Sequence, residues 1–429
     1  MRLLRAVIAG TVLGVAGLAC AGALPARAQG PTGAPAQPQA QAQAAAPAAA
    51  PAPAPVDDPV QRGRYLATAA DCMPCHTARG GTPFAGGRAL NTPFGSITSP
   101  NITPDPATGI GRWSADQFWG ALHDGLRADG AYLYPVMPFT SCTRITRPDA
   151  DAIFAYLRSL PPANAPRQPN GLAFPFDVRA TLGVWRELFF RPGAFTPDPA
   201  KSAEWNRGAY LGTALGHCGE CHTPRNLMGA TARRRAMQGA VVDGWFAPDI
   251  APADPRSAVA GWPVERIATW LRGGASSAKG TAFGPMGEVA HDSLSKLTEA
   301  DLRALATWLA DSAPPARPAP AVAEPDRAAA GLYLTYCAGC HQPLGTGVAG
   351  AIPPLAGNAA VLAAQPNNVI QAVLNGIPAQ GNYGAMPSFA ATLGDAQVAA
   401  IANYVRGAWP PASTGAAATP AMVAGLRRA

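Results

Sequence analysis

The sequence has few charged residues and lacks the patterns of several protein classes. Charged residues make up 14% of the 429 residues, and the formal net charge is +7. No basic run interleaved with aromatic residues occurs, so a nucleic-acid partner is not expected. Beyond Ala28 no apolar run is long enough to cross a bilayer, so we expect no transmembrane helix in that part. No nucleophile–base set or phosphate-binding loop stands out either, and we therefore expect no catalytic residues.

The N-terminal segment 1–28 has the pattern of a secretory signal peptide. Arg2 and Arg5 form the charged start, an apolar run follows, and Ala26-Arg27-Ala28 fits the cleavage pattern. An uncleaved anchor and a lipoprotein modified at Cys20 are the alternatives. The pattern predicts an exported protein, and export permits both disulfides and covalent haem attachment.

Seven cysteines follow this leader, and an odd number argues against a disulfide framework. Six of them form three segments of the pattern Cys-x-x-Cys-His, at residues 72–76, 218–222 and 337–341. Two thiols at this spacing followed by histidine are the attachment signal for a c-type haem. The thiols reach two vinyl groups of one porphyrin as thioethers, and the imidazole reaches the iron. The sequence therefore predicts three haems c bound through Cys72, Cys75, Cys218, Cys221, Cys337 and Cys340. Cys142 is left without a role.

Two other functions of cysteine pairs fit the sequence poorly. A zinc ribbon needs two pairs close together. Here a whole domain's length of chain separates Cys75 from Cys218, and the same is true of Cys221 and Cys337. A thioredoxin-like dithiol would not need a histidine after every pair. Covalent haem remains the better interpretation of all three segments.

The chain repeats one plan three times, which predicts an all-α fold of three tandem cytochrome c-type domains joined by Pro/Ala-rich linkers. Each unit opens with Gly-x-Tyr-Leu before its motif, beginning at Gly63, Gly208 and Gly331. The variable position is occupied by Arg64, Ala209 and Leu332 in turn. Each closes with an amphipathic helix followed by Pro-Pro. The predicted boundaries are 1–28 (signal peptide), 29–57 (disordered Ala/Pro/Gln linker), 58–165 (domain 1), 166–200 (connector), 201–312 (domain 2), 313–325 (linker), 326–411 (domain 3) and 412–429 (loose tail).

Apolar periodicity places the main helices of each unit. Closing helices are predicted near residues 147–160, 298–311 and 394–408, from apolar residues at i, i+3, i+4 and i+7. A helix in the middle of each unit is expected to end at a glycine cap, at Gly125, Gly273 and Gly376. In the connector, residues 178–190 form an apolar stretch. It either packs between the first two domains or forms a docking surface for a partner or the membrane interface.

Each haem iron needs two axial ligands, and the motifs supply His76, His222 and His341. One methionine in each unit precedes the aromatic residue of the closing helix by a nearly constant number of residues. The pairs are Met137 and Tyr156, Met286 and Trp308, and Met386 and Tyr404. This offset predicts that the three methionines are equivalent and are the sixth ligands. With both axial positions filled, each haem passes single electrons, and a thioether ligand raises its reduction potential.

Other residues compete for the sixth position or for the role of the methionines. His123 and His291 could replace a methionine, although a surface helix position for His123 and a loop position for His291 are the simpler interpretations. A methionine can also be a flexible core residue, which suits Met228 and Met237. His217 is expected to line a haem edge or to hydrogen-bond a propionate.

Many segments from about residue 58 to residue 411 carry a family resemblance. They include Asn101-Ile102-Thr103-Pro104-Asp105 and Tyr134-Pro135-Val136-Met137-Pro138-Phe139. The others are residues 64–66, 72–77, 84–87, 91–95, 108–111, 202–208, 216–218 and 221–225. Together with the three motifs in order, they resemble the three-haem cytochrome c subunit of membrane-bound, quinone-reducing alcohol and aldehyde dehydrogenase complexes of acetic acid bacteria and relatives.

This resemblance implies a place in a respiratory chain. Family members sit on the periplasmic face of the bacterial cytoplasmic membrane with a catalytic subunit that carries pyrroloquinoline quinone, molybdenum or flavin. They pass electrons from that subunit to ubiquinone, and a small third subunit is a further candidate partner. Two alternatives stay open. One is the same relay in a sugar or gluconate dehydrogenase complex, and the other is a free periplasmic multihaem enzyme of peroxidase type.

Overall fold

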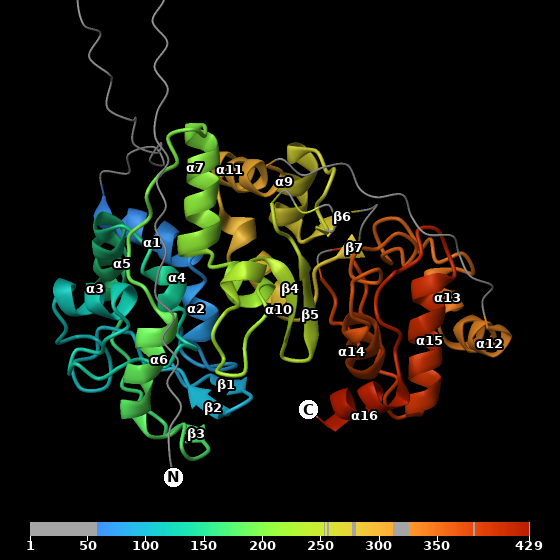
Figure 1. Cartoon of the computed structure of the whole chain (residues 1–429), viewed down its shortest axis with the longest axis horizontal. Coiled ribbons are helices and arrows are strands. Elements are labelled where there is room, and N and C mark those ends of the chain that lie inside the picture. Colours follow the sequence, from blue (N-terminus) through green and yellow to red (C-terminus); the bar gives the residue numbers. More distant parts are fainter. Residues whose placement is uncertain are drawn as a thin grey trace, which may run out of the picture. The chain divides into compact units, whose positions relative to one another are not determined.

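The structure is a computed structural model that describes residues 58–428, apart from 253, 255, 256, 277–279, 312–325 and 381 (Figure 1). The predicted signal peptide and both predicted linkers lie outside the described residues. Within these ranges no helix is both long and apolar enough to cross a membrane. The described chain is mainly helical, as predicted, and we call α1–α5 the first unit, α7–α11 the second and α12–α16 the third.

The helices are short and are separated by long loops. In chain order they are α1 (Pro59–Ala69), α2 (Cys72–Cys75), α3 (Ala115–His123), α4 (Phe139–Cys142), α5 (Arg147–Ser159), α6 (Leu182–Phe189), α7 (Ala203–Tyr210), α8 (Gly219–His222), α9 (Val264–Gly273), α10 (Pro285–Asp292), α11 (Glu299–Leu309), α12 (Arg327–Tyr336), α13 (Ala338–His341), α14 (Asn367–Asn375), α15 (Asp395–Gly407) and α16 (Pro420–Arg428). Single turns of 3-10 helix are η1 (Arg179–Thr181), η3 (Arg233–Arg235) and η4 (Leu294–Lys296), and η2 (Leu211–Leu215) is a π-helix that extends α7.

Short antiparallel strands correct the all-α prediction. They are β1 (Ala89–Thr92), β2 (Gly95–Thr98), β3 (Gly171–Leu172), β4 (Gln238–Val242), β5 (Trp245–Asp249), β6 (Ala275–Ser276) and β7 (Gly280–Thr281). They pair in the orders β1-β2-β3, β4-β5 and β6-β7. Strands this short do not leave a clear alternation of apolar and polar residues. Between β4 and β5, Asp243-Gly244 has positive φ at both residues, which is the dipeptide and the conformation of a tight hairpin turn.

The opening and closing helices of each unit pack together. α1 packs on α5, α7 on α11 and α12 on α15, and the middle helices α3, α9 and α14 also contact the closing helix of their unit. The first two pairs are in backbone contact, because a Cβ on Gly63 would lie 1.8 Å from the Ala152 carbonyl oxygen and one on Gly208 1.9 Å from that of Ala304. In the third unit, Gly331 has open space around it.

The predicted glycine caps are partly correct. Gly125 and Gly376 follow α3 and α14 with positive φ. In the second unit, however, Gly273 is still helical, and Gly274 adopts the left-handed conformation and donates its N–H to the Trp270 carbonyl. The second cap therefore lies one residue later than predicted.

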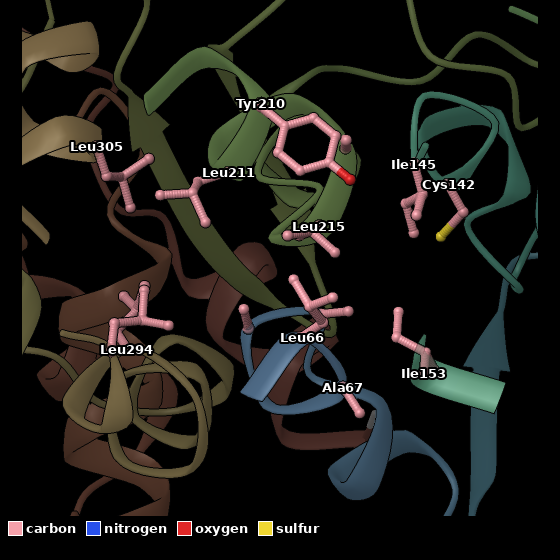
Figure 2. Packing of buried hydrophobic residues seen from close by; sticks show 14 of the residues in the cluster. Leu66, Ala67, Cys142, Ile145, Ile153, Tyr210, Leu211, Leu215, Leu294 and Leu305 are labelled. Carbon is pink, nitrogen blue, oxygen red and sulfur yellow. The ribbon is translucent and has the colours of Figure 1, made fainter. Parts of the chain in front are cut away.

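One hydrophobic core joins the first and second units (Figure 2). Leu66 from α1 and Ile153 from α5 are buried in the same cluster as Leu211, Leu215 and Leu305 from the second unit. Cys142 lies in this core, and its burial raises the pKa of its thiol. The third unit has its own core. In the described part of the chain, three sequence repeats therefore form two main cores.

The C-terminal residues are packed, so the prediction of a loose tail is wrong. α16 begins at Pro420 and places Val423, which is fully buried, against the core of the third unit. Arg427 near its end pairs with Asp395 of α15 at 2.8 Å. Proline is favourable in the first turn of a helix, since the N–H that it lacks would be unpaired there. Pro420 therefore begins a helix and does not interrupt one.

The connector packs against both flanking units, which was the first of its two predicted roles. In α6, Trp185 is buried with Phe139 and Phe190. The indole of Trp185 donates to the Met228 carbonyl at 2.9 Å, so the helix reaches the second unit. α6 also carries two exposed apolar residues, Val184 and Leu188. The docking role predicted for this stretch stays a prediction.

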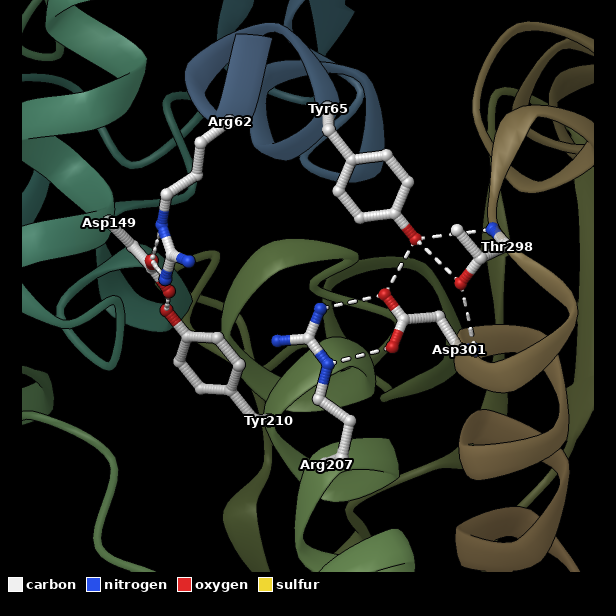
Figure 3. Close-up of polar contacts among 7 residues, drawn as sticks. All are labelled: Arg62, Tyr65, Asp149, Arg207, Tyr210, Thr298 and Asp301. Carbon is white, nitrogen blue, oxygen red and sulfur yellow. Dashed lines mark hydrogen bonds and ion pairs between the residues drawn. The ribbon is translucent and has the colours of Figure 1, made fainter. Parts of the chain in front are cut away.

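Two equivalent polar contacts cross from one unit to the other (Figure 3). In the first, Asp149 of α5 pairs with Arg62 of α1 and accepts a hydrogen bond from Tyr210 Oη of α7 at 2.6 Å. The carboxylate is buried. The opening helix of the second unit therefore donates a hydrogen bond to an ion pair of the first.

The second contact repeats the first with the units exchanged. Asp301 of α11 makes a two-point pair with Arg207 of α7, at 2.8 and 2.7 Å, and accepts from Tyr65 Oη of α1 at 2.6 Å. We call the two contacts the reciprocal tyrosine–aspartate contacts. They relate the first two units by an approximate twofold symmetry that the sequence analysis did not predict.

The third unit is joined to the second by asparagine side chains. Asn368 of α14 donates to the Phe246 carbonyl at 2.9 Å and accepts from the Phe246 N–H at 2.8 Å. Asn367 donates to the Gly244 carbonyl at 3.0 Å. A side-chain amide has both a donor and an acceptor, so it can bond both backbone groups of one residue and continue the edge of strand β5.

Candidate haem-binding sites

Each Cys-x-x-Cys-His segment contains one short turn of helix soon after an opening helix. The turns are α2, α8 and α13. Asp71, with φ of 50°, turns the chain between α1 and α2, and His217, with φ of 36°, does the same after η2. One helical turn places the two thiols of a segment on one side of it. All seven cysteines of the described residues are free, so the six motif thiols are available for thioether bonds.

The three motif histidines have the same kind of hydrogen-bond partner. Nδ1 of His76 lies 2.9 Å from the Pro100 carbonyl oxygen. The corresponding distances are 2.7 Å from His222 to Pro248 and 3.2 Å from His341 to Pro353. Because a carbonyl only accepts, Nδ1 carries the proton and Nε2 keeps the lone pair that binds a metal.

These prolines are functional residues that sequence reasoning missed. Two of them directly precede the repeated middle segments, at Pro100 before Asn101-Ile102 and at Pro248 before Asp249-Ile250. Pro353 begins the equivalent segment of the third unit. The repeat was therefore a signal for an equivalent role, although the sequence alone did not say that the role was a backbone carbonyl facing histidine.

The first site is a cavity of about 1730 Å³ that brings the predicted residues together. Cys72, Cys75, His76 and Met137 all line it, among mostly apolar side chains such as Leu157. A largely apolar cavity with two thiols, an imidazole and a thioether suits a porphyrin and its iron. The residues present fit a c-type haem, which would supply the iron redox couple. Cys221 and Thr223 of the second unit line the same cavity.

The other two predicted methionine ligands lie at the cores of their units. Met286 is in the first turn of α10 and packs against the core shared by the first two units. Met386 packs against the core of the third unit, and its backbone pairs with Ile377. Ligation of iron by these methionines and by Met137 stays a prediction.

The competing residues are placed as follows. His123 is in α3, stacks on Trp119 and lies 2.9 Å from Asp124. His291 is in helix α10, so its loop assignment is wrong, and its side chain is exposed. Met237 is buried in the core as expected, but Met228 is exposed and is therefore not a core residue. His217 lines the first cavity.

Charged side chains hold the first motif against the second unit. Arg88 donates to the Pro74 carbonyl inside the first motif at 3.0 Å and to Glu288 of α10 at 2.8 Å. Glu288 shares the first turn of α10 with Met286. The first attachment segment is therefore connected to the helix that carries the methionine of the second unit.

The second motif is held against the first unit in the same way. Glu220, between its two cysteines, accepts from Thr140 and Ser141 of α4, both at 2.7 Å. These residues follow Met137 closely. Each of the first two motifs is thus fixed to the segment that presents the other unit's methionine.

Burial sets the protonation of the motif side chains. It raises the pKa of the Cys72 and Cys218 thiols to about 12 and those of Cys75, Cys221 and Cys337 to about 11. It also lowers the pKa of His76, His222 and His341. The neutral imidazole is the form that binds a metal.

Asp71 is a second polar feature that the sequence analysis did not single out. It lines the first cavity, and its buried Oδ1 has no hydrogen-bond partner among the described residues. Burial, with the negative charges of Asp292 and Glu288, raises the pKa of Asp71 to about 7. Asp71 directly precedes Cys72 in the chain, so this carboxyl lies beside the first attachment segment.

Helical units with this histidine and thiol arrangement define a c-type cytochrome. Residues 60–161 match the family model described as cytochrome c. Residues 324–405 match the model described as cytochrome C oxidase, cbb3-type, subunit III. The class is therefore supported independently in the first and third units.

Three relatives extend the likeness over most of the chain. The fructose dehydrogenase cytochrome subunit of Gluconobacter japonicus is 37% identical, over 81% of this chain and 78% of that protein. The cytochrome c subunit of alcohol dehydrogenase (quinone) from Gluconacetobacter polyoxogenes is 36% identical, over 82% of this chain and 80% of that protein. A nicotinate dehydrogenase subunit of Pseudomonas putida is 41% identical over 81% of this chain, which spans only 30% of that protein. The chain belongs to the family of cytochrome c subunits of dehydrogenase complexes, and it is an electron carrier rather than the catalytic subunit.

Proposed function

We propose that this chain carries three covalent haems c and relays electrons from a catalytic alcohol or aldehyde dehydrogenase subunit to ubiquinone. The observation that carries the proposal is the threefold arrangement of motif histidine and proline carbonyl, which leaves Nε2 available to iron at three places. The named roles of the relatives, as cytochrome subunits of alcohol (quinone) and fructose dehydrogenases, support a dehydrogenase partner.

The proposal includes a location and an order of components. Residues 1–28 have the pattern of a signal peptide, and c-type haem is attached outside the cytoplasm, so the chain works on the periplasmic face of the cytoplasmic membrane. The partner subunit carries pyrroloquinoline quinone, molybdenum or flavin and oxidises the substrate. The haems of this chain accept its electrons one at a time, and ubiquinone in the membrane receives them.

Haem stoichiometry and substrate-driven reduction test this function. In a pyridine haemochrome assay the purified holoprotein should give three haems per chain, and a count of two or fewer would contradict the proposal. In the native complex, ethanol or acetaldehyde should reduce the haems without oxygen. The isolated chain should stay oxidised with the same substrate, because the substrate is oxidised on the partner. Reduction of the isolated chain would contradict the relay role.

A relay in a sugar or gluconate dehydrogenase complex is the second candidate, and the fructose dehydrogenase cytochrome subunit, 37% identical against 36% for the alcohol dehydrogenase subunit, supports it equally well. Reduction of the haems in the native complex by fructose, and not by ethanol, would identify the sugar dehydrogenase relay rather than the alcohol dehydrogenase relay. Carbon monoxide separates both from a peroxidase-type enzyme. Such an enzyme needs an open or displaceable axial position, so carbon monoxide should change its reduced spectrum. In a relay with methionine on every iron, the reduced spectrum should not change.

A further inference from the structure

Four arginines line the first cavity, and three of them form a cluster at its wall; the fourth, Arg225, is paired with Glu220 at 2.8 Å. Arg127 lies in the loop after α3, and Arg167 and Arg179 come from the connector. All three line the cavity that contains Cys72 and His76. Arg167 is exposed to solvent, whereas Arg127 and Arg179 are half-buried.

Neighbouring protein groups leave this cluster positively charged. Arg127 pairs with the carboxylate of Asp129 at 2.8 Å. Arg179 donates to the Tyr132 carbonyl at 2.5 Å and lies over the ring of Tyr134, with 4.4 Å from guanidinium carbon to ring centre. Neither tyrosine group carries a negative charge. Arg179 is thus oriented but not neutralised.

Arg167 is the least compensated of the three. No hydrogen bond or ion pair holds its guanidinium within the described ranges of the chain. Partial burial, together with the positive charges of Arg127 and Arg179, lowers the pKa of Arg167. Asp129 is the carboxylate that opposes this effect. Three guanidinium groups against one carboxylate leave two positive charges without a partner.

A c-type haem brings two carboxylates into a cavity that is otherwise mainly apolar. A carboxylate in apolar surroundings is costly unless a positive group pairs with it. Arginine is well suited to this role because its planar guanidinium can bond both carboxylate oxygens. The two uncompensated positive charges equal the two negative charges of the haem propionates.

We propose that Arg127, Arg167 and Arg179 bind the propionates of the first haem. This assignment rests on the proposed covalent haem at Cys72 and Cys75. It adds a redox consequence, because positive charge close to a haem stabilises the ferrous state, which carries one positive charge fewer than the ferric state. The cluster therefore raises the reduction potential of the first haem.

The test compares holoprotein variants of the full chain by spectroelectrochemical titration. Arg167→Gln removes one charge, Arg167→Lys keeps it, and Arg64→Gln removes an exposed charge of α1 that does not line the cavity. In Arg167→Gln we expect one of three midpoint potentials to fall, by a threefold to tenfold change in its one-electron equilibrium constant. It should be the midpoint that Met137→Ala also lowers. Arg167→Lys should keep most of the wild-type value, and Arg64→Gln should not change any midpoint.

Two outcomes would overturn the assignment. If all three midpoints stay unchanged in Arg167→Gln and in a variant with all three arginines replaced by glutamine, the cluster does not hold the propionates. If those variants instead lose affinity for the dehydrogenase subunit with unchanged midpoints, the cluster is a docking surface for an acidic partner. Failure of the proposed function looks different. There, the wild-type chain has fewer than three haems, and replacing Cys72 and Cys75 by serine leaves the count unchanged.

Discussion

At the scale of single residues, three proline carbonyls fix the tautomer of three histidines. Pro100, Pro248 and Pro353 accept from Nδ1, so the opposite nitrogen of each ring keeps its lone pair. The sequence predicted the histidines because they are part of the motif. It did not predict the prolines, since a backbone carbonyl belongs to every residue and only folding decides which one faces a ring.

The sixth ligand of the third haem is testable at one methionine. Met386→Ala should lower one midpoint potential by at least a tenfold change in equilibrium constant, which is about 59 mV for one electron. The reason is that thioether sulfur stabilises ferrous iron. The haem count should remain three. Spectroelectrochemical titration measures the midpoint, and Met228→Ala, at an exposed methionine of the second unit, is the control that should leave this midpoint unchanged. Three unchanged midpoints would remove Met386 as a ligand.

Glycine is required where opening and closing helices touch. An alanine at position 208 would place its Cβ 1.9 Å from the Ala304 carbonyl oxygen, so Gly208→Ala should lower the free energy of unfolding by about 3 kcal/mol. Gly331→Ala is the matched control, because it has open space in α12 and should raise the stability by up to about 1 kcal/mol. Chemical denaturation followed by circular dichroism compares them. Equal effects at both positions would contradict the close contact.

At the scale of elements, the reciprocal tyrosine–aspartate contacts join two helix pairs. Burial raises the pKa of Tyr65 to about 12 and also raises that of Tyr210, so both hydroxyls stay protonated and can donate at neutral pH. A hydrogen bond to a buried carboxylate contributes more than one between neutral groups. The two contacts therefore add stability to the common core and fix how the first unit lies against the second.

Replacing either tyrosine should weaken this junction to a similar extent. Tyr65→Phe and Tyr210→Phe should each lower the free energy of unfolding by about 2 kcal/mol, since each removes the hydrogen bond to a charged aspartate and the one that the hydroxyl accepts from the N–H of Thr298 or Thr146. Thermal unfolding of the holoprotein measures the loss. Tyr383→Phe in the third unit, away from the junction, should have little effect. A loss in only one of the two junction variants would argue against their equivalence.

The main helices were predictable because they bury one stripe over three turns, and the closing helices begin and end close to their predicted limits. The tyrosine–aspartate contacts were not predictable from the sequence, because Tyr65 and Asp301 are 236 residues apart and no local sequence pattern marks either residue. Similarly, the short strands depend on partners such as Gly95 with Leu172 that no local pattern specifies. Local periodicity therefore predicts elements, whereas long-range polar pairs arise only from packing.

At the scale of the whole molecule, the third repeat departs from the first two. It has Ala330 where they have Arg62 and Arg207, and Gln397 where they have Asp149 and Asp301. Gln397 instead accepts from the N–H of Gly394 and caps α15. Without the charged pair it cannot repeat the contact between the first two units. Three similar sequence repeats therefore give one joined pair and a third unit attached differently.

The attachment of the third unit depends on Asn368. Asn368→Ala removes both hydrogen bonds to Phe246, at 2.8 and 2.9 Å, and leaves its backbone groups without their side-chain partner. Two such bonds contribute about 1–3 kcal/mol together, so hydrogen exchange at the Phe246 amide should become roughly tenfold faster, because about 1.4 kcal/mol corresponds to a factor of ten. Asn375→Ala, on the same helix but bonded to Gln371, should leave that amide unchanged. If Phe246 exchanged equally slowly in both variants, the asparagine contact would not hold the two units together, and the separate core of the third unit would have to be attached elsewhere.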